Sequence, residues 1–586
     1  MLIALSIFGW NRTQFTLDDQ EFQIVGGAID LIRIPHQYWE NRIISAKTMG
    51  INTMVVQLNW NAIEQADGSL DFTTEQNNLS NFIQLCKKHD LQLILRPGPQ
   101  SHYYTAIGGV PIRMHYINVS SRDVNDKVWV AGVSAYIQAV SEIVKKNVEN
   151  VAMIQLDQLT GLDSVSGDYL RLLRQLYISN GIFGPFTLLE SATKLNNLQG
   201  AAIGLSGSVE QYEVDTVQKS WPHWPVYYGN KYTGGATTYL SDSPKQKILR
   251  IQDELKNKQS MIFFPICGGT SFGLEAGGIS SMTYDAYTTS NDFGAPLTEN
   301  GYPTPSFLRL QKQIKGSNED KVDVLPMQSV QEFTMKKVGT IEAQNFVSKG
   351  TFVEPPTFES QNQREGMGIY EIQITPNSSG IFSFEKVRDY AQIYLDGELI
   401  HTFDRQQDVS FNYLIEDTKS GLLKIVVDTS GHSGFPGYSY TDDLKGLWGL
   451  NLFNNSKMTN FKLSLLDIEN FKPVEKLTEG SFIGGLFQGQ FTANQTDTYL
   501  DLKNFKKGYV FVNGINIGRY WNVKDDQSKN HYSRMYCPGV YLKSGINEIT
   551  VLDVISTLTQ VQVAGFELAF ACPAGQVEHG QECNKE

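Results

Sequence analysis

The chain is 586 residues long, contains 41% hydrophobic and 19% charged residues, and carries a formal net charge of −13 at pH 7. This length exceeds one compact core and predicts roughly three or four domains, and the composition excludes a largely disordered protein. An acidic chain without a Lys/Arg-rich run is a poor candidate for binding nucleic acid or an anionic membrane surface, whereas sugar-handling proteins fit this profile.

The first ten residues, Met1–Trp10, are apolar but lack a basic segment and a small-residue cleavage site. They fit either the remnant of a signal peptide or an opening strand. No later run of about eighteen apolar residues occurs, so no transmembrane helix is expected.

Two further patterns bear on the compartment. Cys572 and Cys583 flank a polar loop near the C-terminus and are candidates for a small disulfide, whereas Cys86 and Cys267 are interpreted as buried thiols. Sequons for N-glycosylation occur at Asn11, Asn78, Asn118, Asn377, Asn454 and Asn494. These patterns favour the secretory pathway, either extracellular or lysosomal, and leave the oligomeric state and incorporation into a larger assembly open.

Strand-like and helix-like runs alternate from about residue 20 to residue 316, beginning with a strand and an amphipathic helix from Pro35 to about Met49. Eight short strands separated by helices predict a (β/α)8 barrel, also called a TIM barrel. A doubly wound sheet would alternate too, but no Gly-x-Gly-x-x-Gly follows the first strand. The expected strands lie at 22–30, 52–58, 91–96, 151–157, 184–190, 200–205, 224–229 and 260–266.

The pattern changes after Ile314 to short alternating runs broken by Gly, Asn and Asp. Tyr390–Ile400 contains an Asp-Gly turn and Gly508–Trp521 an Asn-Gly turn, and both predict β-hairpins. We therefore predict a multidomain chain in which two antiparallel, jelly-roll-like β-sandwich domains follow the barrel. The expected boundaries are 1–316 for the barrel, 317–340 for a linker, 341–470 for the first sandwich and 471–586 for the second.

Five motifs follow one another along the chain: Lys47–Asn52, Ile94–Pro99, Val151–Gly161, Cys267–Gly273 and Val512–Trp521. In this order they resemble glycoside hydrolase family 35, the lysosomal-type β-galactosidases, over nearly the whole chain. The resemblance implies descent from a retaining exo-β-galactosidase, in which two glutamates about 5 Å apart act as acid/base and nucleophile.

The position of the acid/base glutamate is occupied by a residue that cannot transfer a proton. The run from Val151 to Gly161 resembles the family segment Gln-Val/Ile-Glu-Asn-Glu-Tyr-Gly, and Gln155 and Gly161 match its two ends. In this register the acid/base glutamate falls on Leu159. The resemblance therefore implies a member without a general acid.

The nucleophile position is changed as well. The family's nucleophile segment resembles Pro225–Gly234, which places Asn230 at that position. The loss does not depend on the register, because no Asp or Glu occurs from Thr216 to Ser241. We expect Leu159 and Asn230 to face each other across the mouth of the barrel.

The sugar-binding positions implied by the resemblance also depart from the family pattern. Asp30 stands where the family has His, Gln57 replaces a strand-two Tyr, and Gln158 replaces the Asn before the acid/base. The candidate substrate-binding residues are Asp30, Gln57, Asn61, Glu64, Tyr103, Tyr104, Gln158, Tyr228 and Tyr232.

Each remaining candidate has a structural alternative. Asp157 lies two residues before Leu159 and is either a deeper catalytic carboxylate or a hydrogen-bonded barrel residue. Glu64 fits a structural hydrogen bond. No paired His spacing and no Cys/His cluster occurs, so neither a metal nor a cofactor is expected. An aromatic set either stacks on sugar faces or packs in the barrel: Tyr103, Tyr104, Trp221, Trp224, Tyr227, Tyr228 and Tyr232.

Three functions follow from these observations. The first is a β-galactosidase-like protein without catalysis that binds a glycan or a protein at the barrel mouth, and an empty aromatic-lined pocket would favour it. The second is an active retaining glycosidase for terminal β-galactosides, which needs two displaced carboxylates about 5–10 Å apart. The third is a structural subunit, favoured by a mouth filled by its own side chains. The displaced carboxylates considered are Asp157, Asp163, Glu275 and Asp285.

Overall fold

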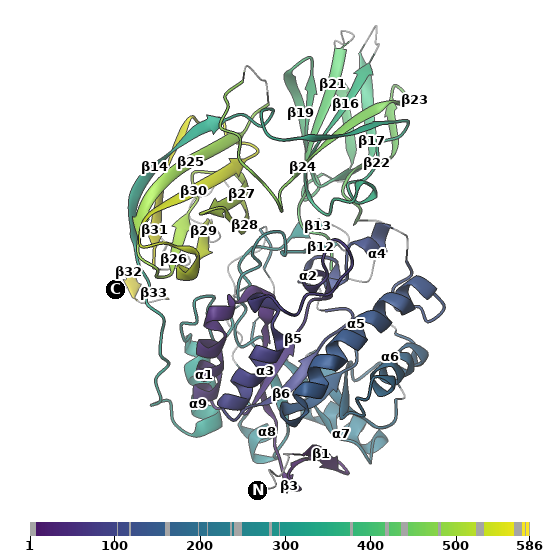
Figure 1. Cartoon of the computed structure of the whole chain (residues 1–586), viewed down its shortest axis with the longest axis vertical. Coiled ribbons are helices and arrows are strands. Elements are labelled where there is room, and N and C mark those ends of the chain that lie inside the picture. The colour runs from purple at the N-terminus through teal and green to yellow at the C-terminus, as the bar shows by residue number, and fades with distance from the viewer. Residues whose placement is uncertain are drawn as a thin grey trace.

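A computed structural model gives the fold of the chain, a barrel with two β-rich domains beside its upper end (Figure 1). The described residues are 7–101, 104–116, 119–158, 165–196, 198–207, 209–234, 237–239, 249–280, 284–291, 294–374, 379–408, 410–415, 421–434, 443–478, 482–522, 533–567, 577–579 and 582–584.

Eight parallel strands close into a barrel, so the predicted (β/α)8 fold is confirmed. The barrel closes because the last strand pairs with the first, with Met261 opposite Val25. In chain order the strands are β4 (Val25–Asp30), β5 (Thr53–Gln57), β6 (Gln92–Arg96), β7 (Val151–Gln155), β8 (Phe186–Glu190), β9 (Ala201–Ser206), β10 (Val226–Tyr232) and β11 (Met261–Phe264).

The helices cover the outside of the barrel with an apolar face. In the longest, Lys127–Lys146, the Asp126 carboxylate caps the first turn through the N–H groups of Val128 and Trp129. Its buried residues recur at helical spacing, which turns one face toward the strands. The helices are α1 (Trp39–Met49), α2 (Trp60–Ile63), α3 (Leu79–Lys88), α4 (Arg113–Tyr116), α5 (Lys127–Lys146), α6 (Gly167–Ser179), α7 (Gln211–Ser220), α8 (Gln252–Lys256) and α9 (Pro305–Lys315).

A small antiparallel sheet closes the N-terminal end of the barrel. It consists of β1 (Phe8–Asn11), β2 (Gln14–Leu17) and β3 (Gln20–Glu21). The ring of Phe15 meets Tyr227 in the barrel interior edge-on, at 5.6 Å between centroids. The opening-strand interpretation therefore holds for the part of Met1–Trp10 that the structure describes, which begins at residue 7.

The first β-rich domain is a sandwich of two antiparallel sheets around a core that includes Phe358, Tyr370, Phe382 and Ile425. One sheet has the order β15, β24, β16, β21, β18, β19 and the other β20, β17, β22, β23. Their bounds are β15 (Val347–Phe352), β16 (Gly366–Ile374), β17 (Gly380–Arg388), β18 (Tyr390–Leu395), β19 (Glu398–Asp404), β20 (Phe411–Ile415), β21 (Gly421–Asp428), β22 (Gly446–Phe453), β23 (Ser456–Lys457) and β24 (Phe461–Asp467).

The second β-rich domain is an eight-stranded antiparallel sheet wrapped around its own core, in the order β28, β27, β30, β25, β14, β31, β26, β29. The bounds are β14 (Val330–Gly339), β25 (Gly485–Ala493), β26 (Thr498–Asp501), β27 (Lys507–Val512), β28 (Ile515–Trp521), β29 (Arg534–Cys537), β30 (Gly545–Asp553) and β31 (Gln560–Phe566). A separate two-stranded sheet follows, formed by β32 (Val577–His579) and β33 (Glu582–Asn584).

The segment 317–340 predicted as a linker contains a strand, because β14 occupies Val330–Gly339 and pairs with both β25 and β31. Thr334 is opposite Gln562, so this pairing joins segments that are far apart in the chain. The second sandwich therefore begins before the first, which is inserted between β14 and β25.

Both predicted hairpins are present. Asp396 and Gly397 join β18 to β19 with φ of 48° and 90°, and Asn513 and Gly514 join β27 to β28 with φ of 51° and 82°. Positive φ at both central residues is the requirement of the type I′ turn, which explains why Asp-Gly and Asn-Gly identified these hairpins.

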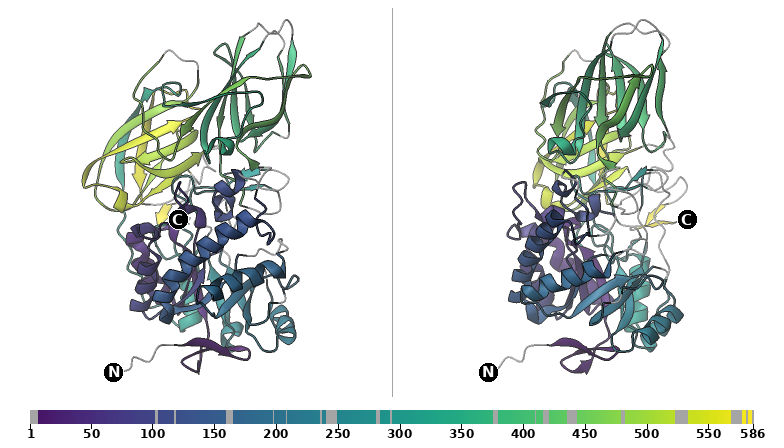
Figure 2. Two further views of the ribbon diagram at one scale, coloured as in Figure 1. Left: turned by 45° about the vertical axis from the view of Figure 1, so that its right-hand side comes forward. Right: turned by 90° about the vertical axis from the view of Figure 1, so that its right-hand side faces the viewer.

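The sandwiches lie beyond the C-terminal ends of the barrel strands, at the end opposite β1–β3 (Figures 1 and 2). A hairpin that follows β11, made of β12 (Gly278–Ser280) and β13 (Tyr284–Ala286), joins the barrel to the first sandwich. The described part of the chain contains no helix with the length and apolar character of a membrane span.

Candidate functional site

The C-terminal ends of the barrel strands bring Arg96 and Asn230 together. Asn230 is 1% exposed, and its Oδ1 accepts a hydrogen bond of 2.9 Å from Nη1 of Arg96. Nη2 of Arg96 donates to the carbonyl of Gly229 at 2.8 Å. Active sites of such barrels lie at this face. Asn230, the residue at the expected nucleophile position, is therefore buried at the barrel end and hydrogen-bonded to Arg96 of β6, the third strand of the barrel.

A register shift in β10 turns Asn230 inward. The pairing with β9 is regular to Tyr228 and shifts before Asn230, so Gly229 sits in a bulge. A Cβ at Gly229 would lie 2.5 Å from Leu189 Cδ1, which leaves no room for a side chain there. Without the shift, the strict alternation of a strand would give Asn230 the outward orientation of Tyr228.

Arg96 carries a charge that no carboxylate of the described residues neutralises. Burial lowers its pKa to about 10, and its described hydrogen-bond partners are the neutral oxygens of Asn230 and Gly229. Its Nε has no hydrogen-bond partner in the described part of the chain. The end of the barrel therefore holds a cation opposite an amide.

Leu159 and Tyr103 lie outside the described residues. The predicted geometry of Leu159 and Asn230 across the mouth therefore remains a prediction, as does a sugar contact of Tyr103.

The carboxylate of Asp157 is surrounded by donors. Oδ1 accepts from the backbone N–H groups of Gln158 and Gln100 at 2.7 and 3.2 Å, and Oδ2 accepts from Nε of Arg122 at 2.9 Å. Burial raises the pKa of Tyr169 on α6, and the negative charge of Asp157 adds to this, which places the carboxylate on the side of α6. This environment favours the structural alternative for Asp157.

Asp30, Gln57 and Tyr104 come together, but they leave little space. Asp30 pairs with Nε of Arg33 at 3.7 Å, and Gln57 donates to the carbonyl of Arg96 at 3.0 Å. The cavity that they line, together with Phe264, has a volume of about 10 Å³. Such a volume holds about one water molecule, which is far smaller than a sugar ring.

Asn61 and Glu64 connect two loops. Glu64 accepts a hydrogen bond of 2.9 Å from Nη2 of Arg113 and a second one from its Nε. Oδ1 of Asn61 accepts from the N–H of Ile112 at 3.3 Å. Gln158, another candidate, accepts a hydrogen bond of 3.1 Å from the Gln155 amide. These contacts favour the structural alternative for Glu64 and indicate similar roles for the other two.

The aromatic candidates are dispersed. Tyr228 faces outward, where its hydroxyl donates to Gln211 of α7 at 3.0 Å, so its assignment to the mouth is wrong. Tyr227 points inward toward the end of the barrel that β1–β3 close, where it contacts Phe15. Trp221 and Trp224 pack against each other next to α7. Tyr104 lines the small cavity with Phe264, and the ring of Tyr232 meets that of Phe264 edge-on, so these two aromatic candidates lie near the C-terminal end of the barrel.

The displaced carboxylates point in different directions. Glu275 pairs with Arg364 of the first sandwich at 2.9 Å, and Asp285 lies in β13, where partial burial raises its pKa. Asp163 lies outside the described residues. These positions provide no support for a displaced catalytic pair.

Two buried glutamates were missed by the sequence reasoning. Glu190, at the end of β8, accepts from the N–H of Asn196 at 2.9 Å, and Glu299 accepts from the hydroxyl of Thr270 at 2.7 Å. Burial raises the pKa of each to about 7. The signal for Glu190 was its position at the C-terminal end of the strand predicted at 184–190.

The predicted modification sites are described only in part. Asn11, Asn454 and Asn494 are exposed and Asn78 is half-buried, whereas Asn118 and Asn377 lie outside the described residues. The side chains of Cys572 and Cys583 also lie outside them, and Cys86 and Cys267 are buried, as predicted. The described residues contain no group of three His, Cys, Asp or Glu arranged to hold a metal ion.

A family model for the glycosyl hydrolases family 35 matches residues 14–317, which is more than half of the chain. The chain belongs to this family. Models for the first all-beta domain and the galactose-binding domain of β-galactosidases match residues 355–467 and 485–547. These matches fall within the two β-rich domains that follow the barrel.

Similar proteins match over nearly their whole length. A β-galactosidase of Xanthomonas manihotis is 26% identical, over 88% of this chain and 90% of its own. The human β-galactosidase-1-like protein 2 is 27% identical, over 94% of this chain and 90% of its own. β-Galactosidase 17 of Arabidopsis thaliana is 25% identical, over 92% and 86%. The family 35 resemblance predicted from the motifs is thereby confirmed.

Proposed function

We propose that this family 35 protein does not hydrolyse β-galactosides and that it acts by binding. The observation that carries the proposal is the hydrogen bond from Arg96 to the Asn230 amide, at the position that the family motif assigns to the nucleophile. An active retaining enzyme needs a carboxylate there, because the glycosyl-enzyme ester forms on its oxygen.

The amide of Asn230 cannot replace that carboxylate. Its oxygen is neutral and already accepts from the Arg96 guanidinium, which withdraws electron density from it further. If Leu159 occupies the acid/base position, the leaving oxygen also lacks a proton donor. Each loss alone costs several orders of magnitude in rate, since general acid catalysis contributes about 10²–10⁴-fold and the covalent route needs its nucleophile.

The small cavity at the barrel end favours a partner bound on the outer surface over a sugar enclosed in the mouth. The side chains of Asp30, Gln57 and Tyr104 leave about 10 Å³ between them. A protein partner needs no such cavity. Glycan binding inside this cavity would require Asp30, Gln57 and Tyr104 to move apart, whereas Tyr232, which is half-buried, already has an accessible edge.

The first prediction is that the native protein turns over an aryl β-galactoside no faster than a buffer control, with or without azide. Aryl groups leave without much protonation, so this substrate reveals a nucleophile even when the general acid is missing. Release of the aryl alcohol is measured, and the double variant Leu159→Glu, Asn230→Glu is assayed in parallel to see whether two carboxylates restore turnover.

Native turnover well above the control, lost in Asp157→Asn but kept in Asp168→Asn, would replace this proposal with the displaced-carboxylate enzyme. Asp168 is the matched control because its side chain is 73% exposed and it pairs with Arg171 on its own helix. Circular dichroism must show that both variants are folded, since Asp157 also holds Arg122.

We also propose that the protein enters the secretory pathway and carries N-glycans. The sequons at Asn11, Asn454 and Asn494 support this, because all three asparagines are exposed. Enzymatic removal of N-glycans from protein isolated from its native cells is expected to lower the mass seen by mass spectrometry. An unchanged mass would contradict glycosylation.

A further inference from the structure

Three domains meet at a buried cluster of charged side chains around His432. Nη1 of Arg519, from β28 of the second sandwich, donates to Glu365 of the first, and Nη2 donates to the carbonyl of Ala276 in the loop that follows β11 of the barrel. The carbonyl of His432 accepts from the N–H of Gly278 in β12 at 3.0 Å. The cluster therefore joins the barrel to both sandwiches, in the region where Figures 1 and 2 show the domains meeting.

Both ring nitrogens of His432 face a carboxylate. Nε2 lies 2.6 Å from Oε1 of Glu359, and Nδ1 lies 3.1 Å from Oε1 of Glu365. All three side chains are buried. Contacts this short between a nitrogen and a carboxylate oxygen need a hydrogen between the two atoms.

The two contacts together require two hydrogens, and a neutral imidazole supplies only one. The second hydrogen is present when His432 is an imidazolium or when Glu359 is protonated. Without it, a nitrogen lone pair would point at a carboxylate oxygen in a site closed to water. The geometry thus assigns one titratable proton to the pair His432 and Glu359.

The surrounding groups keep this proton in place. Burial lowers the pKa of His432, but the hydrogen bonds to Glu359 and Glu365 outweigh burial, so that the pKa lies above the ordinary 6.5. Burial also raises the pKa of Glu359 above its ordinary value. Both shifts favour the protonated pair. The charged groups that act on the pair directly are Glu365, Asp443 and Lys445. Arg364 and Arg519 act on Glu365, and Arg364 also pairs with Glu275.

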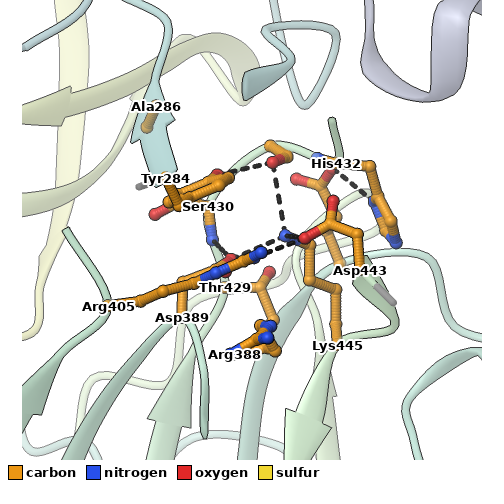
Figure 3. A network of polar contacts seen from close by, with 12 residues as sticks. Tyr284, Ala286, Arg388, Asp389, Arg405, Thr429, Ser430, His432, Asp443 and Lys445 are labelled. Carbon is orange, nitrogen blue, oxygen red and sulfur yellow. Dashed lines mark hydrogen bonds and ion pairs between the residues drawn. The ribbon is translucent and has the colours of Figure 1, made fainter. Parts of the chain in front are cut away.

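The neighbouring charges are paired among themselves, so they do not replace the proton. Figure 3 shows Arg405, Asp389, Asp443 and Lys445 converging beside His432. Asp389 binds Arg405 and Lys445 at 2.7 Å each. Lys445 reaches Glu359 only through its backbone N–H, at 2.8 Å. His432 is therefore the basic side chain that pairs with Glu359 in the described part of the cluster.

We propose that the proton shared by His432 and Glu359 is a latch that fastens the barrel to the sandwiches in acid and releases this junction as the pH rises. The folded junction holds a proton that the unfolded chain has lost above about pH 6.5. Its contribution to stability is therefore complete below the ordinary histidine value and disappears as the pH rises through the folded value. The protein is thus held as one three-domain body under acidic conditions.

Hydrogen exchange of the native full-length protein tests the latch between about pH 5.5 and about pH 8.5, a range that spans histidine titration. After correction for the intrinsic pH dependence of exchange, peptides containing Gly278, His432 and Lys445 are expected to exchange faster at the higher pH. The acceleration is about tenfold for each unit by which the folded pKa exceeds the unfolded one. Peptides from β7 in the barrel are expected to show no change.

Glu359→Gln is the deciding variant. Its amide carries a permanent N–H toward Nε2 of a neutral His432, while its oxygen still accepts from the N–H of Lys445, so the junction is expected to lose its pH dependence. His432→Gln removes the titrating ring and is expected to expose the junction at every pH. Should His432→Gln fail to fold, Glu359→Gln alone decides. If the native pH response persisted in Glu359→Gln, the latch would be overturned. Equal protection of the native junction across the whole pH range would overturn it as well.

His36→Gln is the matched control. His36 lies 2.5 Å from Glu75, whose side chain is 79% exposed, so this pair lies at the surface, away from the domain junction. The control is expected to keep the native pH response. If the pH response were lost in His36→Gln, it would arise from histidine titration in general, and this would contradict the latch.

Discussion

The end of the barrel and the junction between the domains are both buried and both hold cations, but the cations have different partners. Arg96 in the barrel donates to neutral oxygens of Asn230 and Gly229. At the junction, Arg519 donates to Glu365, and Lys445 lies 2.7 Å from Asp389. A buried charge is expensive unless an opposite charge and hydrogen bonds compensate for it.

This difference indicates where the molecule depends on ionic chemistry. The junction uses carboxylates to hold three domains together, whereas the barrel end has the Asn230 amide at the position that the motif resemblance assigns to the nucleophile. A paired cluster stabilises an assembly, while a cation opposite an amide supplies neither a nucleophile nor a proton donor. The contrast supports a role that depends on the assembled surface of the protein.

Removal of one junction carboxylate is expected to have the largest effect. Asp389→Asn removes one of the two anions that Arg405 and Lys445 share, because Asp389 contacts both at 2.7 Å and is fully buried, and it leaves them with Asp443. Breaking a buried ion pair by removing one partner typically costs about 3–5 kcal/mol. Urea unfolding is expected to show this loss in the free energy of unfolding.

Glu142→Gln provides the comparison at the surface. Glu142 and Lys145 form an ion pair on α5 with side chains 54% and 40% exposed, and such pairs contribute about 0–1 kcal/mol. Equal losses in Asp389→Asn and Glu142→Gln would mean that the junction charges are solvated, which would remove the contrast with the barrel end.

Local patterns were sufficient to predict most of the fold. Most of the eight barrel strands are short apolar runs that alternate with helices, and each hairpin has its own turn residues. The strand β14 was missed because its sequence, Val330–Gly339, contains three charged residues and acquires its partners β25 and β31 much later in the chain. Pairing over such a separation leaves no local signal.

The candidate site was predicted less completely, because side-chain direction and partners depend on distant segments. The bulge at Gly229 decides that Asn230 faces inward, and Arg96, its partner, lies 134 residues away. The ring of His432 meets glutamates that are 67 and 73 residues away. A sequence shows that these residues are titratable or polar, but only the assembled domains show what each one faces.

Asn230→Asp is expected to have a smaller effect and one of opposite sign. Asp has the shape of Asn, so the contact of 2.9 Å to Arg96 is kept and becomes charge-assisted. A hydrogen bond to a charged group contributes about 1.5–3 kcal/mol, against about 0.5–1.5 kcal/mol for a neutral one. The cost of burying the new carboxylate offsets part of this gain in hydrogen-bond energy. We therefore expect the free energy of unfolding to rise by about 1 kcal/mol near neutral pH.

The second oxygen of the aspartate introduced by Asn230→Asp also has a donor within reach, since the Asn230 amide nitrogen now lies 3.5 Å from the hydroxyl of Ser206, which can rotate to donate.

Asn150→Asp is the matched control. Asn150 is buried and donates to the carbonyls of Ile83 and Leu91, so a carboxylate there would face two acceptors and lower stability. A gain at position 230 with a loss at position 150 would show that the barrel cation lacks an anion. Losses at both positions would instead mean that Arg96 already has an acidic partner, and the proposed contrast between the barrel and the junction would fail. Since the gain requires an ionised carboxylate, it should disappear in acid, where the new carboxyl group is protonated.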